Sequence, residues 1–289
     1  MGFPPFTYAV KWLVIINCAI FVLMLLLHGL KPDVSDFLTR TFALIPNSVI
    51  FKGMIWQIVT YSFLHGGLFH LLFNMLTLWM FGSQFEMDWG RKQFLEYYFF
   101  CVIGAALTSI AVGYGALGML HAFPAPLFEN IAGLIHTATI GASGGIFGIL
   151  IAYGIIYGNR EILLWFFLPI KAKYLVAAFI FIALVGALGD AGGVANFAHL
   201  GGAFFGWIYL KFIPRKGLQY ATSERYYGIR NWWIKQRRRR AAKKFEVFMR
   251  DKNQPTNYSE YFDEYGNYKD PNAPPRDKGN GDPRGPWVN

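Results

Sequence analysis

The chain has 289 residues, of which 54% are hydrophobic and only 15% are charged, and its mean hydropathy is positive. This composition excludes an ordinary soluble domain and indicates a membrane protein with several spans. The formal net charge of +10 is unevenly distributed, because 17 of the 27 Lys and Arg residues follow Pro214 and 10 precede it. The sequence therefore predicts a membrane domain with few charges, followed by a basic tail.

The apolar runs predict an all-α polytopic protein with six transmembrane helices. The predicted spans are residues 8–30, 58–81, 94–117, 142–157, 174–188 and 197–213. Between them we expect interfacial loops at 31–57 and 158–173, a polar turn at 82–93, and loops at 118–140 and 189–196. The first run is too long for a signal-peptide core, so we expect it to be retained.

An even number of spans places both chain ends on one side of the membrane. The loops on that side hold five cations, Arg91, Lys92, Arg160, Lys171 and Lys173, whereas the opposite loops hold Lys31, Arg40 and Lys52. Because cytoplasmic loops carry the excess of Lys and Arg, both termini are predicted to be cytoplasmic. We expect a multi-pass protein of the bacterial inner (plasma) membrane.

The chain is predicted to have three parts: a six-span membrane domain at 1–213, a basic amphipathic segment at 214–250, and a disordered tail at 251–289. The middle part combines Trp232 and Trp233 with the basic runs 237–240 and 243–244, a pattern typical of a helix that lies on anionic lipid. Nucleic acid is not expected as a partner. The last part is rich in Asn, Asp, Gly and Pro.

Cys18 and Cys101 both lie in apolar runs, which predicts packing residues and neither a disulfide nor a metal-thiolate site. No metal and no cofactor are expected.

The segment 139–150 reads TIGASGGIFGIL and places Ser143 among glycines, just before an apolar run. Ser143 would stand near the N-terminus of the fourth span, where free backbone N–H groups and the helix dipole favour a developing anion. A Gly-x-Ser-x-Gly pattern also occurs in soluble hydrolases and in simple helix packing. The absence of alternating strand patterns around it excludes an α/β-hydrolase.

Polar residues at membrane depth are costly and are therefore functional candidates. His70 and Asn74 are four residues apart in the second span and share one helix face, with His65 further out near the loop. His199 lies in the sixth span. Hydrogen bonding between helices is the structural alternative for His70 and Asn74.

Small residues recur every four positions along the sixth span, at Ala198, Gly202 and Gly206. The fourth span has pairs of the same spacing, Gly141 with Gly145 and Gly144 with Gly148. Such stripes let two helices approach closely. Their contact would bring His199 within reach of Ser143, and a Ser–His pair is the minimum for an activated hydroxyl nucleophile.

Together these residues resemble the rhomboid intramembrane serine proteases. The resemblance rests on His65, His70 and Asn74, on Gly141-Ala-Ser143-Gly144, and on Ala198-His199-Leu-Gly-Gly202. Trp56 and the segments Phe81-Gly82, Phe85-Glu86 and Trp89-Gly90-Arg91 add to it. It covers residues 11–213 and does not extend to the tail.

The resemblance implies an endopeptidase that cleaves membrane proteins in or near their transmembrane segments, by a Ser143–His199 dyad. It assigns the oxyanion to the Ser143 backbone N–H with the side chains of His70 and Asn74. His65, Gly141, Gly144 and Gly202 would support the site, and Phe147 would stack on His199 where relatives often carry Tyr. Gln57 follows Trp56 where relatives commonly carry Arg, which is the chain's departure from the family pattern in the first loop.

Two other functions fit parts of the pattern. One is an inactive relative that binds or escorts membrane clients, although such proteins usually lack the nucleophile. The other is a small transporter or channel in which the three histidines relay protons, but the predicted spans contain no paired Asp or Glu.

Overall fold

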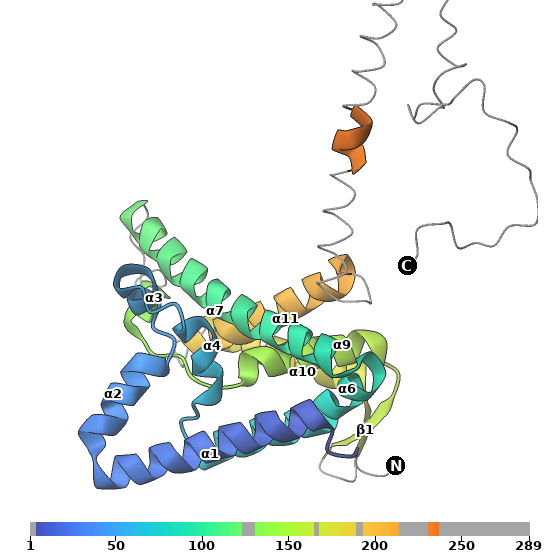
Figure 1. Ribbon diagram of the computed structural model, residues 1–289, viewed down its shortest axis with the longest axis horizontal. Coiled ribbons are helices and arrows are strands. Elements are labelled where there is room, and N and C mark those ends of the chain that lie inside the picture. The colour runs from blue at the N-terminus through green and yellow to red at the C-terminus, as the bar shows by residue number, and fades with distance from the viewer. Residues whose placement is uncertain (1–3, 123–130, 165–167, 189–192, 214–230, 237–289) are drawn as a thin grey trace, which may run out of the picture. The chain divides into compact units, whose positions relative to one another are not determined.

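The computed structural model describes residues 4–122, 131–164, 168–188, 193–213 and 231–236 (Figure 1). The chain divides into two units, Met1–Leu218 and Gln219–Asn289. In the second unit residues 231–236 are helical, with Trp232 and Trp233 exposed. The basic run 237–240 and the segment 251–289 lie outside the described residues, so the lipid-binding tail and its disordered end stay predictions.

The first unit is mostly helical. The first half of its described part contains α1 (Tyr8–Leu30), α2 (Pro32–Phe42), α3 (Pro46–Lys52), α4 (Gln57–Thr60), η1 (Tyr61–Phe63), α5 (Leu68–Thr77), the π-helix η2 (Leu78–Gly82) and α6 (Ser83–Trp89). The second half contains α7 (Arg91–Ala122), η3 (Leu134–His136), α9 (Ser143–Ile156), β1 (Glu161–Leu164), β2 (Leu168–Lys171), α10 (Ala172–Leu188) and α11 (Gly193–Phe212).

Two described helices are long and apolar enough to cross a membrane, namely α1 and the part Arg91–Leu120 of α7. A third span is possible if Gln57–Phe63 and Leu68–Trp89, which are bent by 100° at their junction, are counted as one. The apolar helices α9 and α10 are shorter. An integral membrane protein follows from these helices, whereas the six predicted spans stay a prediction.

The predicted second span, 58–81, is wrong as a single straight helix. The chain leaves helical conformation between Leu64 and Gly67, and the helix that restarts at Leu68 runs on through η2 to Trp89. The two adjacent glycines, Gly66 and Gly67, favour this break because they lower helix propensity. The predicted polar turn at 82–93 is consequently helical apart from Gly90, which has φ +80°.

The predicted interfacial loops also have regular structure. The loop at 31–57 folds into α2, α3 and the start of α4. The segment 162–170 belongs to an antiparallel hairpin in which Glu161 pairs with Lys171 and Leu164 with Leu168. The all-α prediction is wrong for this hairpin, because an apolar segment too short to span can still pair its backbone with itself.

Gln57 holds the first loop together through hydrogen bonds of its side chain. Its side chain is fully buried, its carbonyl oxygen accepts a hydrogen bond from the Ile45 N–H at 3.0 Å, and its amide donates to the Arg40 carbonyl at 2.9 Å. The indole of Trp56 donates to the Thr41 carbonyl at 2.9 Å. A neutral amide thus ties α2 to α4 without burying a charge.

Glu86 holds the start of α1. Its buried carboxylate accepts hydrogen bonds from the backbone N–H groups of Ala9, at 2.8 Å, and Val10, at 3.0 Å. The first N–H groups of a helix lack intrahelical partners and carry the positive end of its dipole. The carboxylate therefore joins α6 to the N-terminus of α1.

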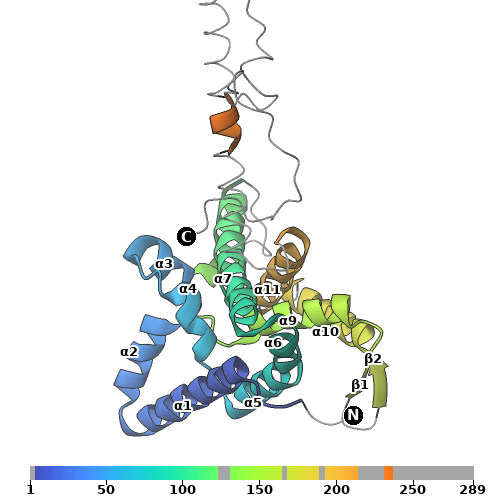
Figure 2. The ribbon, with the colours of Figure 1, turned by 45° about the vertical axis from the view of Figure 1, so that its right-hand side comes forward.

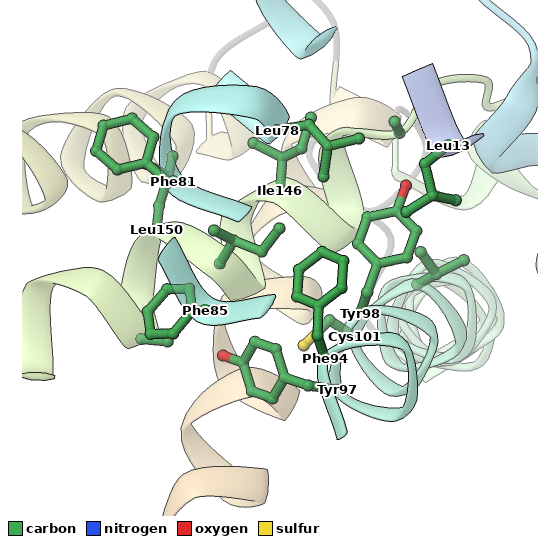
Figure 3. Packing of buried hydrophobic residues seen from close by; sticks show 14 of the residues in the cluster. Leu13, Leu78, Phe81, Phe85, Phe94, Tyr97, Tyr98, Cys101, Ile146 and Leu150 are labelled. Atoms are coloured by element: carbon green, nitrogen blue, oxygen red, sulfur yellow. The ribbon is translucent and has the colours of Figure 1, made fainter. Parts of the chain in front are cut away.

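Helix α9 lies in the middle of the core. Ile146 and Leu150 of α9 pack among Leu78, Phe81 and Phe85 from the α5–α6 segment and Phe94, Tyr97, Tyr98 and Cys101 from α7 (Figure 3). The views in Figures 1 and 2 agree that α7, α9 and α11 are neighbours. The hydroxyl of Tyr97 donates to the Gly148 carbonyl, which links α7 to α9.

The close approach of α9 and α11 depends on glycine. A Cβ added at Gly202 would collide with the carbonyl group of Gly144, and one at Gly206 would lie 3.0 Å from the Cα of Gly148. The predicted contact between small-residue stripes is therefore confirmed for the Gly144 and Gly148 pair. It is wrong for the Gly141 and Gly145 pair, because Gly141 faces His70 of α5 and Gly145 faces Tyr98 of α7.

We predict that Gly202→Ala lowers the free energy of unfolding by about 1–3 kcal/mol, because the added methyl group forces α9 and α11 apart. Thermal unfolding in detergent measures this. The matched control is Gly115→Ala in α7, where nothing lies within 4 Å of the added Cβ. That variant is expected to gain about 0.5–1 kcal/mol. Equal melting temperatures for the two variants would contradict the packing argument.

Candidate active site

Ser143 is the first residue of α9. The Ile146 N–H donates to the carbonyl of Ala142, the residue before the helix, at 3.1 Å. The backbone N–H groups of the first turn have no intrahelical acceptors, and no acidic side chain lies in that turn. A negative charge that develops beside Ser143 would therefore meet free donors and the positive end of the helix dipole.

Backbone hydrogen bonds to two other parts of the chain hold the segment that precedes Ser143. Thr139 exchanges two backbone hydrogen bonds with Leu44, at 2.8 and 3.0 Å. Gly141 has φ +126° and donates its N–H to the Tyr61 carbonyl at 2.9 Å. The approach to the helix is thus fixed by the first loop on one side and by Tyr61 on the other.

His199 of α11 lies against Ser143. Its Nε2 is 2.8 Å from the Ser143 Oγ, and both residues are half-buried. The Phe147 ring stacks on the imidazole with a centroid distance of 4.3 Å and an interplanar angle of 2°. The predicted proximity of the serine and the histidine is confirmed, as is the predicted stacking. With Nε2 unprotonated, the imidazole can accept the hydroxyl proton.

His70 lies on the other side of Gly141. A Cβ added at Gly141 would lie 2.7 Å from the His70 Nε2 and 3.6 Å from the Ser143 Oγ, so both polar atoms lie close to this one glycine. His65 contacts His70 edge to face, with ring centroids 5.1 Å apart. The Ala142 N–H is 3.5 Å from the His65 Nε2. The break before α5 therefore brings two imidazoles to the start of α9.

Asn74 is one turn beyond His70 on α5 and is buried. Its amide donates to the His70 carbonyl at 2.8 Å, which is a bond within its own helix. One amide hydrogen remains for another acceptor. Its role as an oxyanion donor stays a prediction, as does that of His70.

Tyr61 is a further residue of this site that the sequence did not reveal. It is 1% exposed, and its hydroxyl donates to the Val102 carbonyl of α7 at 2.9 Å. A Cβ added at Gly144 would lie 2.8 Å from that hydroxyl. Tyr61 thus supports both Gly141 and Gly144, but a tyrosine in an apolar run carries no signal that would single it out.

The described residues offer no metal centre: no group of three or more His, Cys, Asp and Glu side chains within them is placed to hold an ion.

The family described as "Rhomboid domain" matches residues 52–216, which is more than half of the chain. The chain belongs to the rhomboid family. The match covers α4 to α11 and therefore every rhomboid site residue described above.

Curated relatives agree with this assignment. The chain is 32% identical over 172 residues to "RHOMBOID-like protein 1" of Arabidopsis thaliana, which covers 59% of this chain and 38% of the relative. It is 31% identical over 224 residues to "Rhomboid protein 1, mitochondrial" of Saccharomyces cerevisiae, with 73% and 57% covered. It is 27% identical over 213 residues to "Rhomboid protease GluP" of Bacillus subtilis, with 72% and 34% covered. The aligned part thus spans between a third and three fifths of these rhomboid relatives.

We predict that Gly141→Ala destabilises the protein by about 1–3 kcal/mol, because φ +126° is strained for any residue with a Cβ and the methyl group would press on the His70 ring. Thermal unfolding in detergent measures the loss. Gly67→Ala is the control, since Gly67 is extended with φ 177° and its Cβ would meet nothing within 4 Å. A control variant as unstable as Gly141→Ala would refute the explanation.

Proposed function

We propose that this rhomboid is an intramembrane serine endopeptidase that hydrolyses peptide bonds in or near the transmembrane segments of other membrane proteins. The observation that carries the proposal is the 2.8 Å approach of the His199 Nε2 to the Ser143 Oγ. The relative named "Rhomboid protease GluP" supports a protease. Transmembrane protein substrates are part of the proposal.

The proposed reaction has two halves. Ser143 Oγ attacks the carbonyl carbon of the scissile bond while its proton passes to the His199 Nε2, and the tetrahedral adduct collapses when that proton moves to the departing amine. Water then attacks the acyl-enzyme, giving one proton to His199, and the carboxyl product leaves as Ser143 regains its hydrogen. His199 is the base in each attack and the acid in each collapse.

The oxyanion of each tetrahedral adduct needs fixed donors. We assign this role to the Ser143 backbone N–H together with the His70 and Asn74 side chains. The helix terminus at Ser143 and the position of the His70 Nε2 beside Gly141 support this assignment. Such donors act on the charge as it forms, which is why they change the rate more than they change substrate binding.

Phe147 orients the base in this proposal. A catalytic imidazole must keep one ring nitrogen directed at the hydroxyl, and in many serine proteases a carboxylate does this. Here the parallel Phe147 ring fixes the plane of the imidazole. Stacking restrains the ring through dispersion and supplies no charge, so the orientation comes without the cost of burying a third ionised group.

The membrane arrangement is also proposed. Six spans, with both termini in the cytoplasm, would form a catalytic domain at 1–213, followed by a lipid-binding segment at 214–250 and a tail at 251–289. The cations of the α6–α7 and α9–α10 connections support this orientation. Ser143 would then lie toward the outer face. A bacterial inner (plasma) membrane is the proposed location.

We predict that Ser143→Ala reduces cleavage of a fluorescent single-span substrate by detergent-purified protein about 10⁴-fold or more. Ser109→Ala is the matched control, because Ser109 is buried on α7 and its hydroxyl bonds only its own helix in the described contacts. A fluorophosphonate should label Ser143 in the wild type and leave His199→Ala unlabelled. Equal cleavage by Ser143→Ala, or none by the wild type, would favour an inactive relative that binds clients.

We also predict that Asn74→Ala lowers kcat about 10²–10³-fold with little change in KM, because it removes a donor to the oxyanion. Thr77→Ala is the control on the same helix, since the Thr77 hydroxyl donates to the Phe73 carbonyl as Asn74 does to that of His70. The two variants lose equivalent local bonds. If their kinetic effects are equal, Asn74 has only a structural role.

A further inference from the structure

Two adjoining cavities lie at the end of α9 opposite Ser143. They have volumes of about 600 and 580 Å³ and share Ile155, Ile156 and Tyr157. The first is also lined by Tyr209, Leu210 and Ile213 of the α11 end, and the second by Asn159, Arg160 and Lys173. A helix of 14 residues is about 21 Å long, so these cavities are remote from the Ser143 site.

Two cationic residues line the second cavity, and their contacts hold them in place. The Arg160 guanidinium lies 4.2 Å above the centroid of the Tyr157 ring, and the Lys173 Nζ donates to the Asn159 side chain at 3.0 Å. The Ala172 N–H bonds the Arg160 carbonyl and the Lys173 N–H bonds the Gly158 carbonyl. The turn that follows α9 and the start of α10 therefore hold both cations as one unit.

No carboxylate is among the described residues that line the second cavity. The nearby β1–β2 hairpin carries one charge of each sign at its first register position, Glu161 opposite Lys171. Asp88, which lines the first cavity, accepts hydrogen bonds from the Tyr157 hydroxyl and from the Gln84 amide. Arg160 and Lys173 consequently leave the second cavity with an excess of positive charge.

The dipoles of α9 and α10 act differently on the two cations of the second cavity. Arg160 follows the C-terminus of α9, where the helix dipole favours a cation. Lys173 is the second residue of α10, and the dipole disfavours a cation at a helix N-terminus. A cation held at this helix end is stabilised by an anion beside it, so the position of Lys173 favours an anionic ligand here.

One wall of the first cavity is apolar, while Asp88 and Gln93 line another part of it. Ile155 and Ile156 are 54% and 44% exposed, and Leu210 and Ile213 face the same space from the end of α11. In an integral membrane protein the ends of the apolar helices lie near the lipid headgroups. A ligand that joins a phosphate to hydrocarbon chains matches both cavities.

We propose that these cavities bind one anionic phospholipid, with its phosphate on Arg160 and Lys173 and an acyl chain against Ile155, Leu210 and Ile213. The lipid would join the ends of α9 and α11, which are the helices that carry Ser143 and His199. This site is separate from the predicted lipid-binding segment 214–250, and it does not depend on the protease proposal.

The test uses the full-length protein in detergent with a phosphatidylglycerol that carries a photoactivatable diazirine on its acyl chain. Mass spectrometry of the crosslinked peptides should find adducts near Ile155, Leu210 or Ile213. Phosphatidylcholine with the same diazirine chain should give several-fold fewer adducts there. Crosslinks of equal yield from both lipids, or adducts confined to residues 214–289, would overturn the proposal.

The second part of the test removes the two positive charges of the proposed phosphate site. Arg160→Gln/Lys173→Gln should weaken phosphatidylglycerol binding at this site about tenfold or more, a change of about 1.4 kcal/mol. Lys31→Gln/Arg40→Gln removes two exposed cations elsewhere and should leave the adduct yield unchanged. Inorganic phosphate is added as a competitor. If it suppresses the adducts at millimolar concentration, the site binds a soluble anion and the lipid assignment is wrong.

Discussion

The contact between the backbones of α9 and α11 is the constraint on which the site depends. Gly202 lies against the carbonyl group of Gly144, a separation that side chains larger than hydrogen do not permit. Ser143 precedes Gly144, and His199 lies three residues before Gly202 on the same helix face. The hydroxyl and the imidazole therefore meet because the helices that carry them touch at glycine. The stacked Phe147 ring fixes the plane of the imidazole.

Much of this arrangement could be predicted because it follows from local pattern. The long apolar runs located α1, α7, α9, α10 and α11 to within a few residues. The four-residue spacing of small side chains indicated which two helices would touch. It could not distinguish Gly144 from Gly145 as the contact, since both belong to pairs of equal spacing and the choice depends on the rotation of α9 against α7 and α11.

Features that depend on contacts between residues far apart in the chain could not be predicted from the sequence. The importance of Tyr61 arises from Gly141 and Val102, which are 80 and 41 positions away. The amide of Gln57 is satisfied by carbonyl groups of α2 that only the folded loop brings near. The break of the predicted second span had a local signal in Gly66 and Gly67. The span was predicted from the apolar content of the whole segment, and two glycines change that content little. The hairpin after α9 arises from pairing between two short strands, each too brief to be recognised alone.

The break between Leu64 and Gly67 has a consequence for hydration. Backbone outside a helix cannot satisfy its own polar groups, and at membrane depth this is tolerated only where protein or a wet cavity supplies partners. Here the Gly66 N–H has only the His70 Nδ1 among its described contacts, at a long 3.5 Å. The Gly66 N–H is therefore a polar group that a water molecule beside the start of α9 would satisfy. The same discontinuity brings His65 and His70 to the start of α9. Under the proposed hydrolysis it would offer water, the second reactant, a polar partner inside the bundle.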